Sequence, residues 1–165
     1  MSKLNDSSLN TIRIATFNSL KGSPEIISAL LRMGRSGSVI DNSMSGGIFI
    51  GIYLDSGRLH DNAMAFLENS GMIYDKHPDS GVAFKDFTIP YFREAKDLAC
   101  KAARLLSEKL VGWDIGFSPT GPILIEGNAY FDLGFLDLLD VEHGHYRNNP
   151  VFRKAMVEAG IKISG

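Results

Sequence analysis

The chain has little of several features that mark special classes of protein. It has 165 residues and one cysteine, Cys100, so it forms no internal disulfide and fits a reducing compartment. Its 17 Lys and Arg nearly balance its 19 Asp and Glu, which gives no broad field for nucleic acid or an anionic membrane. No apolar run approaches the roughly 18–20 residues of a membrane span, and the N-terminus lacks a signal-peptide core. We therefore expect a cytoplasmic protein without a membrane span or a nucleic-acid partner.

Composition and hydrophobic pattern predict an α+β fold, an antiparallel sheet with one long packing helix. Apolar residues make up 44% and charged residues 22%, as in an ordinary globular domain. Residues 1–9 are expected to be a loose polar tail and residues 10–165 one subdomain. The predicted strands are 11–17, 48–54, 58–66, 111–117 and 122–128, the predicted helices are 91–110 and 150–159, 68–89 reads as irregular, and 25–33 fits strand or helix.

The stretch from Val111 to Asn128 carries the most chemical information. Two strand-like runs flank Ser-Pro-Thr-Gly, a sequence typical of a three-residue hairpin loop, which pairs Ser118 with Pro122 and Asp114 with Glu126. Like charges directly opposite each other are unfavourable, and a divalent cation between them is the simplest explanation. Asn128 offers a third oxygen on the same side. The alternative is an ordinary half-exposed hairpin with its acids in water.

Alternation divides the side chains of this hairpin between two faces. One face is expected to be core, and the other to hold the two acids. Glycines on the acidic face would leave space for a ligand to approach the backbone. The expected core face consists of Trp113, Ile115, Phe117, Ile123 and Ile125, and the acidic face of Gly112, Asp114, Gly116, Leu124 and Glu126.

Three other segments contain candidate ligand-binding residues, each with a simpler alternative. Arg13 could bind phosphate through two parallel hydrogen bonds or be an ordinary surface arginine. Arg32 and Arg35 could face an anionic substrate or lie in water at a strand end. Asn42, in a loop rich in serine and glycine, could touch a ligand or belong to a plain surface turn. His77, Asp79 and Ser80 could shape an acceptor pocket or form a turn.

Two further features favour the simpler interpretation. His143 and His145 lack a clear third metal ligand, so a solvated loop is preferred over a metal site. Cys100 is interpreted as a small residue on the buried side of the long helix rather than as a nucleophile.

Three blocks in order resemble the ATP-grasp ligases. They are the strand Asn10–Phe17 with Arg13, the segment Leu31–Arg35 followed by Asp41-Asn42 and Gly46-Gly47, and the acidic hairpin with Glu126-Gly127-Asn128. The nearest resemblance, over about residues 10–130, is to the sugar-transfer-associated ATP-grasp group, related to alpha-L-glutamate ligases. It favours a strand at 25–33.

The resemblance implies an ATP- and magnesium- (or manganese-) dependent carboxylate–amine ligase that acts through an acylphosphate. It implies that Asp114, Glu126 and Asn128 hold the metal, that Arg13 and Arg32 serve catalysis, and that the nucleotide is bound by Arg13, Met33, Asn42 and Leu124. Substrates would be small-molecule or sugar-linked carboxylates. The match leaves no room for the earlier ATP-grasp subdomain, so we expect a partner half or a second copy of the chain. The alternatives are a non-catalytic nucleotide- or metal-binding remnant of such a ligase that regulates a partner, and a partner-interaction domain without such a site.

Overall fold

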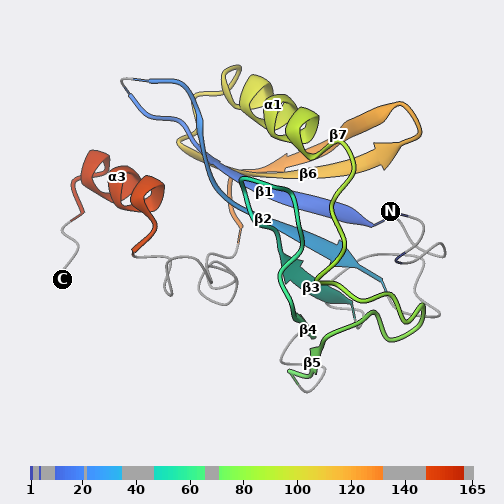
Figure 1. The fold of residues 1–165 in the computed structure, drawn as a ribbon. Helices are drawn as coiled ribbons and strands as arrows, with labels where there is room; N and C mark the ends of the chain where they lie inside the picture. Colours follow the sequence, from blue (N-terminus) through green and yellow to red (C-terminus); the bar gives the residue numbers. More distant parts are fainter. Residues whose placement is uncertain are drawn as a thin grey trace.

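The computed structural model describes residues 1, 4, 10–20, 22–34, 47–65, 71–131 and 148–161. Its centre is a seven-stranded antiparallel sheet with the strand order β5-β4-β3-β2-β1-β6-β7 (Figure 1). The strands are β1 (Thr11–Phe17), β2 (Glu25–Met33), β3 (Ile48–Gly51), β4 (Ala63–Ala65), β5 (Ile73–Tyr74), β6 (Leu110–Ser118) and β7 (Gly121–Asn128). The described helices are α1 (Phe92–Ala103) and α3 (Pro150–Glu158). The predicted α+β class is confirmed, and so is the strand at 25–33.

Helix α1 covers one face of the sheet and contacts β1, β2, β6 and β7 (Figure 1). It buries Phe92, Ala95, Ala99 and Ala103, which recur every three or four residues and therefore form one apolar stripe. The sheet meets this stripe with alternate residues of each strand, among them Ile14, Leu31, Ile50 and Trp113. We call this side of the sheet the helix face and the other side the open face.

The long helix ends seven residues earlier than the predicted boundary at 110. Leu105 and Leu106, which lie within the predicted helix at 91–110, are outside the observed one and are 85% and 44% exposed. The side-chain amide of Asn18, 85 residues before Ala103, donates to the carbonyl of Ala103 at 2.7 Å and to that of Glu108 at 2.9 Å. Helix ends leave carbonyls without intrahelical partners, and Asn18 satisfies one of them from a distant strand.

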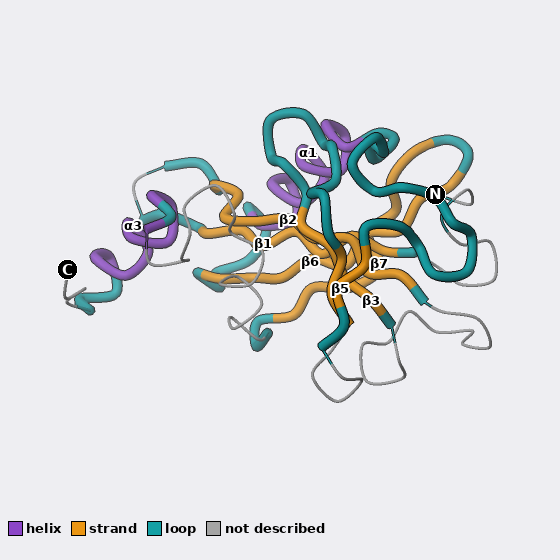
Figure 2. Tube along the Cα trace, turned by 60° about the horizontal axis from the view of Figure 1, so that its bottom comes forward, coloured by secondary structure: helices purple, strands orange, loops and turns teal. Residues whose placement is uncertain are grey.

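Helix α3 packs on the open face against β1 and β2, near the hairpin that joins these two interior strands (Figure 2). Asn149 caps it by accepting from the N–H groups of Val151 and Phe152, and Pro150 follows at the first helical position, as helix starts favour. Asn149 also donates to the carbonyl of Ile27 at 3.0 Å. The predicted helix at 150–159 is confirmed. Neither described helix is long and apolar enough to cross a membrane.

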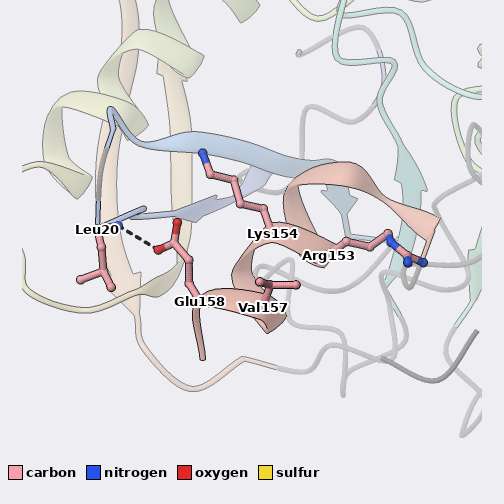
Figure 3. Close-up of a pocket in the computed structure, with 5 residues that line it drawn as sticks. All are labelled: Leu20, Arg153, Lys154, Val157 and Glu158. Carbon is pink, nitrogen blue, oxygen red and sulfur yellow. Dashed lines mark hydrogen bonds between the residues drawn. The ribbon is translucent and has the colours of Figure 1, made fainter. Parts of the chain in front are cut away.

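The tip of the β1–β2 hairpin and the end of α3 form a shallow apolar hollow lined by Leu20, Arg153, Lys154, Val157 and Glu158 (Figure 3). The Glu158 carboxylate accepts from the N–H of Leu20 at 2.9 Å and from the hydroxyl of Ser19 at 2.6 Å. These bonds, of which the first is the larger contribution, lower the pKa of Glu158. The end of α3 is thereby tied to the hairpin.

Two other expectations need correction. The hairpin predicted at 48–54 and 58–66 has shorter strands, because only Ile48–Gly51 and Ala63–Ala65 pair regularly and a single bridge joins Ile52 to Leu59. The loose tail predicted at 1–9 is wrong at Leu4, whose side chain is fully buried in the main core.

Candidate functional site

Asp114 lies on the open face, on strand β6 next to the edge strand β7, and is bound by two arginines. It is the β6 partner of Arg13 on β1, and the two side chains form a bidentate ion pair. Nε of Arg13 donates to Oδ1 of Asp114 and Nη2 to Oδ2, both at 2.7 Å. The Asp114 side chain is only 4% exposed, whereas that of Arg13 is 21% exposed. A buried carboxylate is therefore neutralised by a guanidinium that still reaches solvent.

Arg32 brings a second guanidinium to the same carboxylate from strand β2. Its Nη2 donates to Oδ2 of Asp114 at 3.0 Å. Nε and Nη2 of Arg32 also lie 3.3 and 3.2 Å from the hydroxyl oxygen of Thr11, its cross-strand partner. The cluster of Arg13, Arg32 and Asp114 has a formal charge of +1, which suits an anionic ligand. The structure thus brings together both predicted catalytic arginines and one predicted metal ligand.

Glu126 and Asn128 lie on β7 beside this cluster. Glu126 is the cross-strand partner of Asp114, as predicted. Nδ2 of Asn128 donates to Oε1 of Glu126 at 3.0 Å, so these two side chains share one side of the strand. Glu126 is exposed and Asn128 half-buried. The three predicted metal ligands are therefore neighbours, and two of them are open to solvent.

The pairing of Asp114 with Glu126 arises differently from the prediction. Ser118 pairs with Gly121, not with Pro122, so the loop has two residues instead of three. A bulge in β7 then inserts Ile125 between the residues that face Ile115 and Asp114, which restores the predicted partner. The shorter loop and the bulge each shift the register by one residue in opposite directions, so Glu126 lies opposite Asp114.

Between the turn and the bulge, the shifted register reverses the predicted faces of Ile123 and Leu124. Leu124 lies opposite Ile115 and packs against the main core. Ile123 lies opposite Gly116, on the Asp114 side, and is 54% exposed, while Ile125 is 49% exposed. The expectation that Ile123 and Ile125 are core and that Leu124 lines the open side is therefore wrong.

Of the described residues predicted to bind the nucleotide, Arg13 belongs to the arginine cluster, whereas Met33 and Leu124 lie away from it. Met33 is fully buried in the core on the helix face, as Leu124 partly is, so their placement gives no support to contacts with a nucleotide. The space expected above Gly112 is filled: a Cβ there would lie 3.1 Å from the ring of Phe131 and 3.4 Å from Cδ of Arg13.

Several candidates lie outside the described residues, namely Arg35, Asn42, His143 and His145. His77 is described and fully buried. Its Nδ1 lies 3.3 Å from the N–H nitrogen of Asp79 and 3.4 Å from that of Ser80, so Nε2 carries the proton and donates to the carbonyl of Gly34 at 3.2 Å. These bonds favour the interpretation of this segment as a turn. Cys100 is half-buried on α1, and burial raises the pKa of its thiol, which suits a packing residue.

The arginine partners of Asp114 were not predicted, although the sequence holds a signal for them. Arg13 is the only charged residue of β1, and Arg32 is the only one of β2 apart from Glu25 at its start; an arginine in a largely buried strand needs a counter-ion. Asp114 is the only acid in a strand of the same kind. Thr11, which accepts from Arg32, carried no such signal.

The chemistry of the donors suits a hard cation, because Asp114, Glu126 and Asn128 offer only oxygen ligands. Within the described ranges no group of three His, Cys, Asp or Glu is placed to hold a metal ion. The candidate set here differs from such a group because it consists of two acids and one amide. Both oxygens of Asp114 already accept from arginine. The oxygen atoms of Asp114, Glu126 and Asn128 are suitable ligands for a hard cation. To bind a metal, however, Asp114 would have to share an oxygen with an arginine or lose one of its arginine hydrogen bonds.

An antiparallel sheet with a helix on one face, and two arginines beside an acidic hairpin on the other, is consistent with a subdomain of an ATP-grasp enzyme. The family model for sugar-transfer associated ATP-grasp matches residues 1–146, and the chain belongs to this family. The family supports nucleotide binding and an ATP-dependent, ligase-like function. No curated protein matches the chain.

Proposed function

We propose that this chain is the metal-binding subdomain of an ATP- and Mg²⁺-dependent carboxylate–amine ligase that works through an acylphosphate. The observation that carries the proposal is the pairing of Asp114 with Glu126 beside Arg13 on the open face of the sheet. Membership of the ATP-grasp family supports it, since the family generally uses ATP and Mg²⁺. The substrates would be small carboxylates, free or linked to a sugar.

Asp114, Glu126 and Asn128 are the residues that would hold the metal. A bound metal would neutralise the charge of the phosphates during phosphoryl transfer. Glu126 and Asn128 present their side chains to solvent on the same side of β7, so they are accessible to a cation that arrives with a nucleotide.

Arg13 and Arg32 would bind the phosphates. A guanidinium binds phosphate oxygens through parallel hydrogen bonds, and preorganised positive charge favours the transition state of phosphoryl transfer. In the proposed reaction a carboxylate oxygen attacks the γ-phosphorus and ADP leaves. An amine then attacks the acyl carbon, phosphate leaves and the amine loses a proton. The residues' contribution is placement and charge rather than covalent chemistry.

Ile123 replaces Leu124 as the apolar residue proposed to contact the nucleotide. It is exposed, lies on the Asp114 side of β7 and has a glycine, Gly116, as its cross-strand partner. The sheet offers the nucleotide one wall, and nucleotide pockets bury most of the ligand. We therefore propose that a second ATP-grasp subdomain, in the same polypeptide or another, closes over this face.

Calorimetry with a magnesium complex of a non-hydrolysable ATP analogue tests the proposal. We expect the chain alone to bind weakly, with a Kd of about 1 mM, because only one wall is present. Glu126→Gln should remove the binding, whereas Glu94→Gln, a change at an exposed residue on α1, should leave it unchanged. Equal binding by both variants would reject Glu126 as part of the site.

A second candidate function is favoured by the contacts of Asp114. Because both of its oxygens are bound by arginine, the cluster could bind an anion without a metal and without catalysis, as in a regulatory remnant of a ligase. Hydroxylamine converts an acylphosphate to a stable hydroxamate, so ATP, a set of carboxylates and hydroxylamine separate the two functions. Hydroxamate formation that is lost in Glu126→Gln supports the ligase. Metal-independent binding of ATP without hydroxamate supports the remnant.

A further inference from the structure

Arg13 holds both carboxylate oxygens of Asp114, the atoms that would bind a metal ion. It donates a hydrogen bond of 2.7 Å to each oxygen. The two residues are direct cross-strand partners on the neighbouring strands β1 and β6. Arg32 differs because it lies on β2, which is separated from β6 by β1. It donates to one oxygen of Asp114 at 3.0 Å and also contacts the hydroxyl of Thr11. Arg13 is therefore the principal counter-ion of Asp114.

A divalent cation bound to Asp114 would lie within a few ångströms of the Arg13 guanidinium. At that distance, in a site where Asp114 is 4% exposed, repulsion between the two cations is weakly screened. The metal ion and the Arg13 guanidinium cannot keep all of their contacts with the Asp114 carboxylate at the same time. The Arg13 side chain is 21% exposed, so part of it already reaches solvent while it is paired with Asp114.

We propose that Arg13 and the divalent metal exchange at Asp114, so that metal binding releases the Nε–Nη2 edge of Arg13 for phosphate oxygens. This inference rests on the proposed function. In the nucleotide-free chain Arg13 serves as the counter-ion and weakens metal binding. A polyphosphate that attracts Arg13 frees Asp114, so phosphate and metal strengthen each other's binding, as reciprocal linkage requires. Arg13 is thus a positioning residue in one state and a phosphate ligand in the other.

Titration with Mn²⁺ alone, followed by electron paramagnetic resonance, tests the exchange in the absence of nucleotide. Arg13→Met should bind Mn²⁺ about tenfold more tightly than the wild type, the value expected when a competing charged hydrogen bond is lost. Arg13→Lys keeps the charge but loses the two-pronged geometry, and it should also bind more tightly, by a smaller factor. The control Arg93→Met removes one charge from an exposed position on α1 and should bind like the wild type.

Tighter binding by Arg13→Met but not by Arg13→Lys would show simple repulsion through space and would overturn the exchange. Unchanged or weaker binding by both would also overturn it. Failure of the proposed function has a different result: the wild type and both Arg13 variants would bind no Mn²⁺, and tripolyphosphate would not promote binding.

A second measurement uses the wild-type chain and does not depend on the stability of a variant. The Nε–H signal of Arg13 in a nitrogen-15 correlation spectrum reports its hydrogen bond to Asp114. Saturation with Mg²⁺ and tripolyphosphate should shift this signal, while the Nε–H signal of Arg93 should stay in place. Saturated metal binding with an unchanged Arg13 signal would contradict the exchange.

Discussion

Replacing Asp114 with asparagine should destabilise the fold, although it removes a carboxylate that faces another. Asp114 is 4% exposed and accepts three hydrogen bonds from Arg13 and Arg32. Removing one member of a buried ion pair costs about 3–5 kcal/mol, because the remaining charge is left without a partner. Each arginine side chain is about a fifth exposed and can regain some hydration, so we expect a loss of about 2–4 kcal/mol.

Thermal and urea unfolding measure this loss directly. For a domain of this size, 2–4 kcal/mol corresponds to a fall in Tm of about 5–15 °C. Glu126→Gln is the matched control, because it removes a carboxylate from an exposed position on the paired strand. Its free energy of unfolding should stay within about 0.5 kcal/mol of the wild type.

A double-mutant cycle assigns the loss to the ion pair. Asp114→Asn in an Arg13→Met background should cost less than in the wild type, with a coupling energy of about 1–3 kcal/mol. The reasoning is refuted if Asp114→Asn is as stable as the wild type or more stable. That result would mean that repulsion between Asp114 and Glu126 outweighs the arginine contacts.

Three further outcomes follow from other contacts. Gly127→Ala should destabilise by about 1–3 kcal/mol in urea unfolding, because its Cβ would lie 2.7 Å from the ring of Trp113; a neutral result would mean that the ring moves aside. The lowered pKa of Glu158 means that its contribution is full above its ordinary value of 4.5 and is lost as pH falls through the lower folded value, so the protection factors of α3 amides, relative to an unfolded chain at the same pH, should fall only in acid; Glu158→Gln should remove that pH dependence, and an unchanged profile would contradict the reasoning. The raised pKa of Cys100 should make it react with an aromatic disulfide at pH 8 more slowly than free cysteine, and an equal rate would disagree with its burial.

The sequence predicted structure correctly where residues close together in the chain determine it, as in the hairpin of β6 and β7. The turn residues located the hairpin, and the predicted pairing of Asp114 with Glu126 is observed because the shorter loop and the bulge compensate each other. The sequence did not predict the faces of Ile123 and Leu124, because the two-residue loop shifts the alternation by one residue. The bulge at Ile125 shifts it back, and no residue type marks that bulge.

Contacts between distant segments escaped prediction for a different reason. Arg13 and Asp114 are 101 residues apart, and their register is set by the packing of β1 against β6 rather than by either strand alone. The early end of α1 likewise depends on Asn18, which no periodicity in the helix reveals. The family resemblance predicted the positions of the candidate site but not their contacts with one another.

Paramagnetic broadening by manganese–ATP tests the central claim most directly. If the hairpin holds the metal, Mn²⁺ bound with ATP should broaden the amide signals of Asp114 and of Glu126–Asn128 first, and leave those of α3 sharp. Asp79 and Glu158, acids elsewhere on the surface, serve as internal controls. Broadening centred on those acids, or none at concentrations of ATP well above 1 mM, would contradict a metal–nucleotide site on the open face.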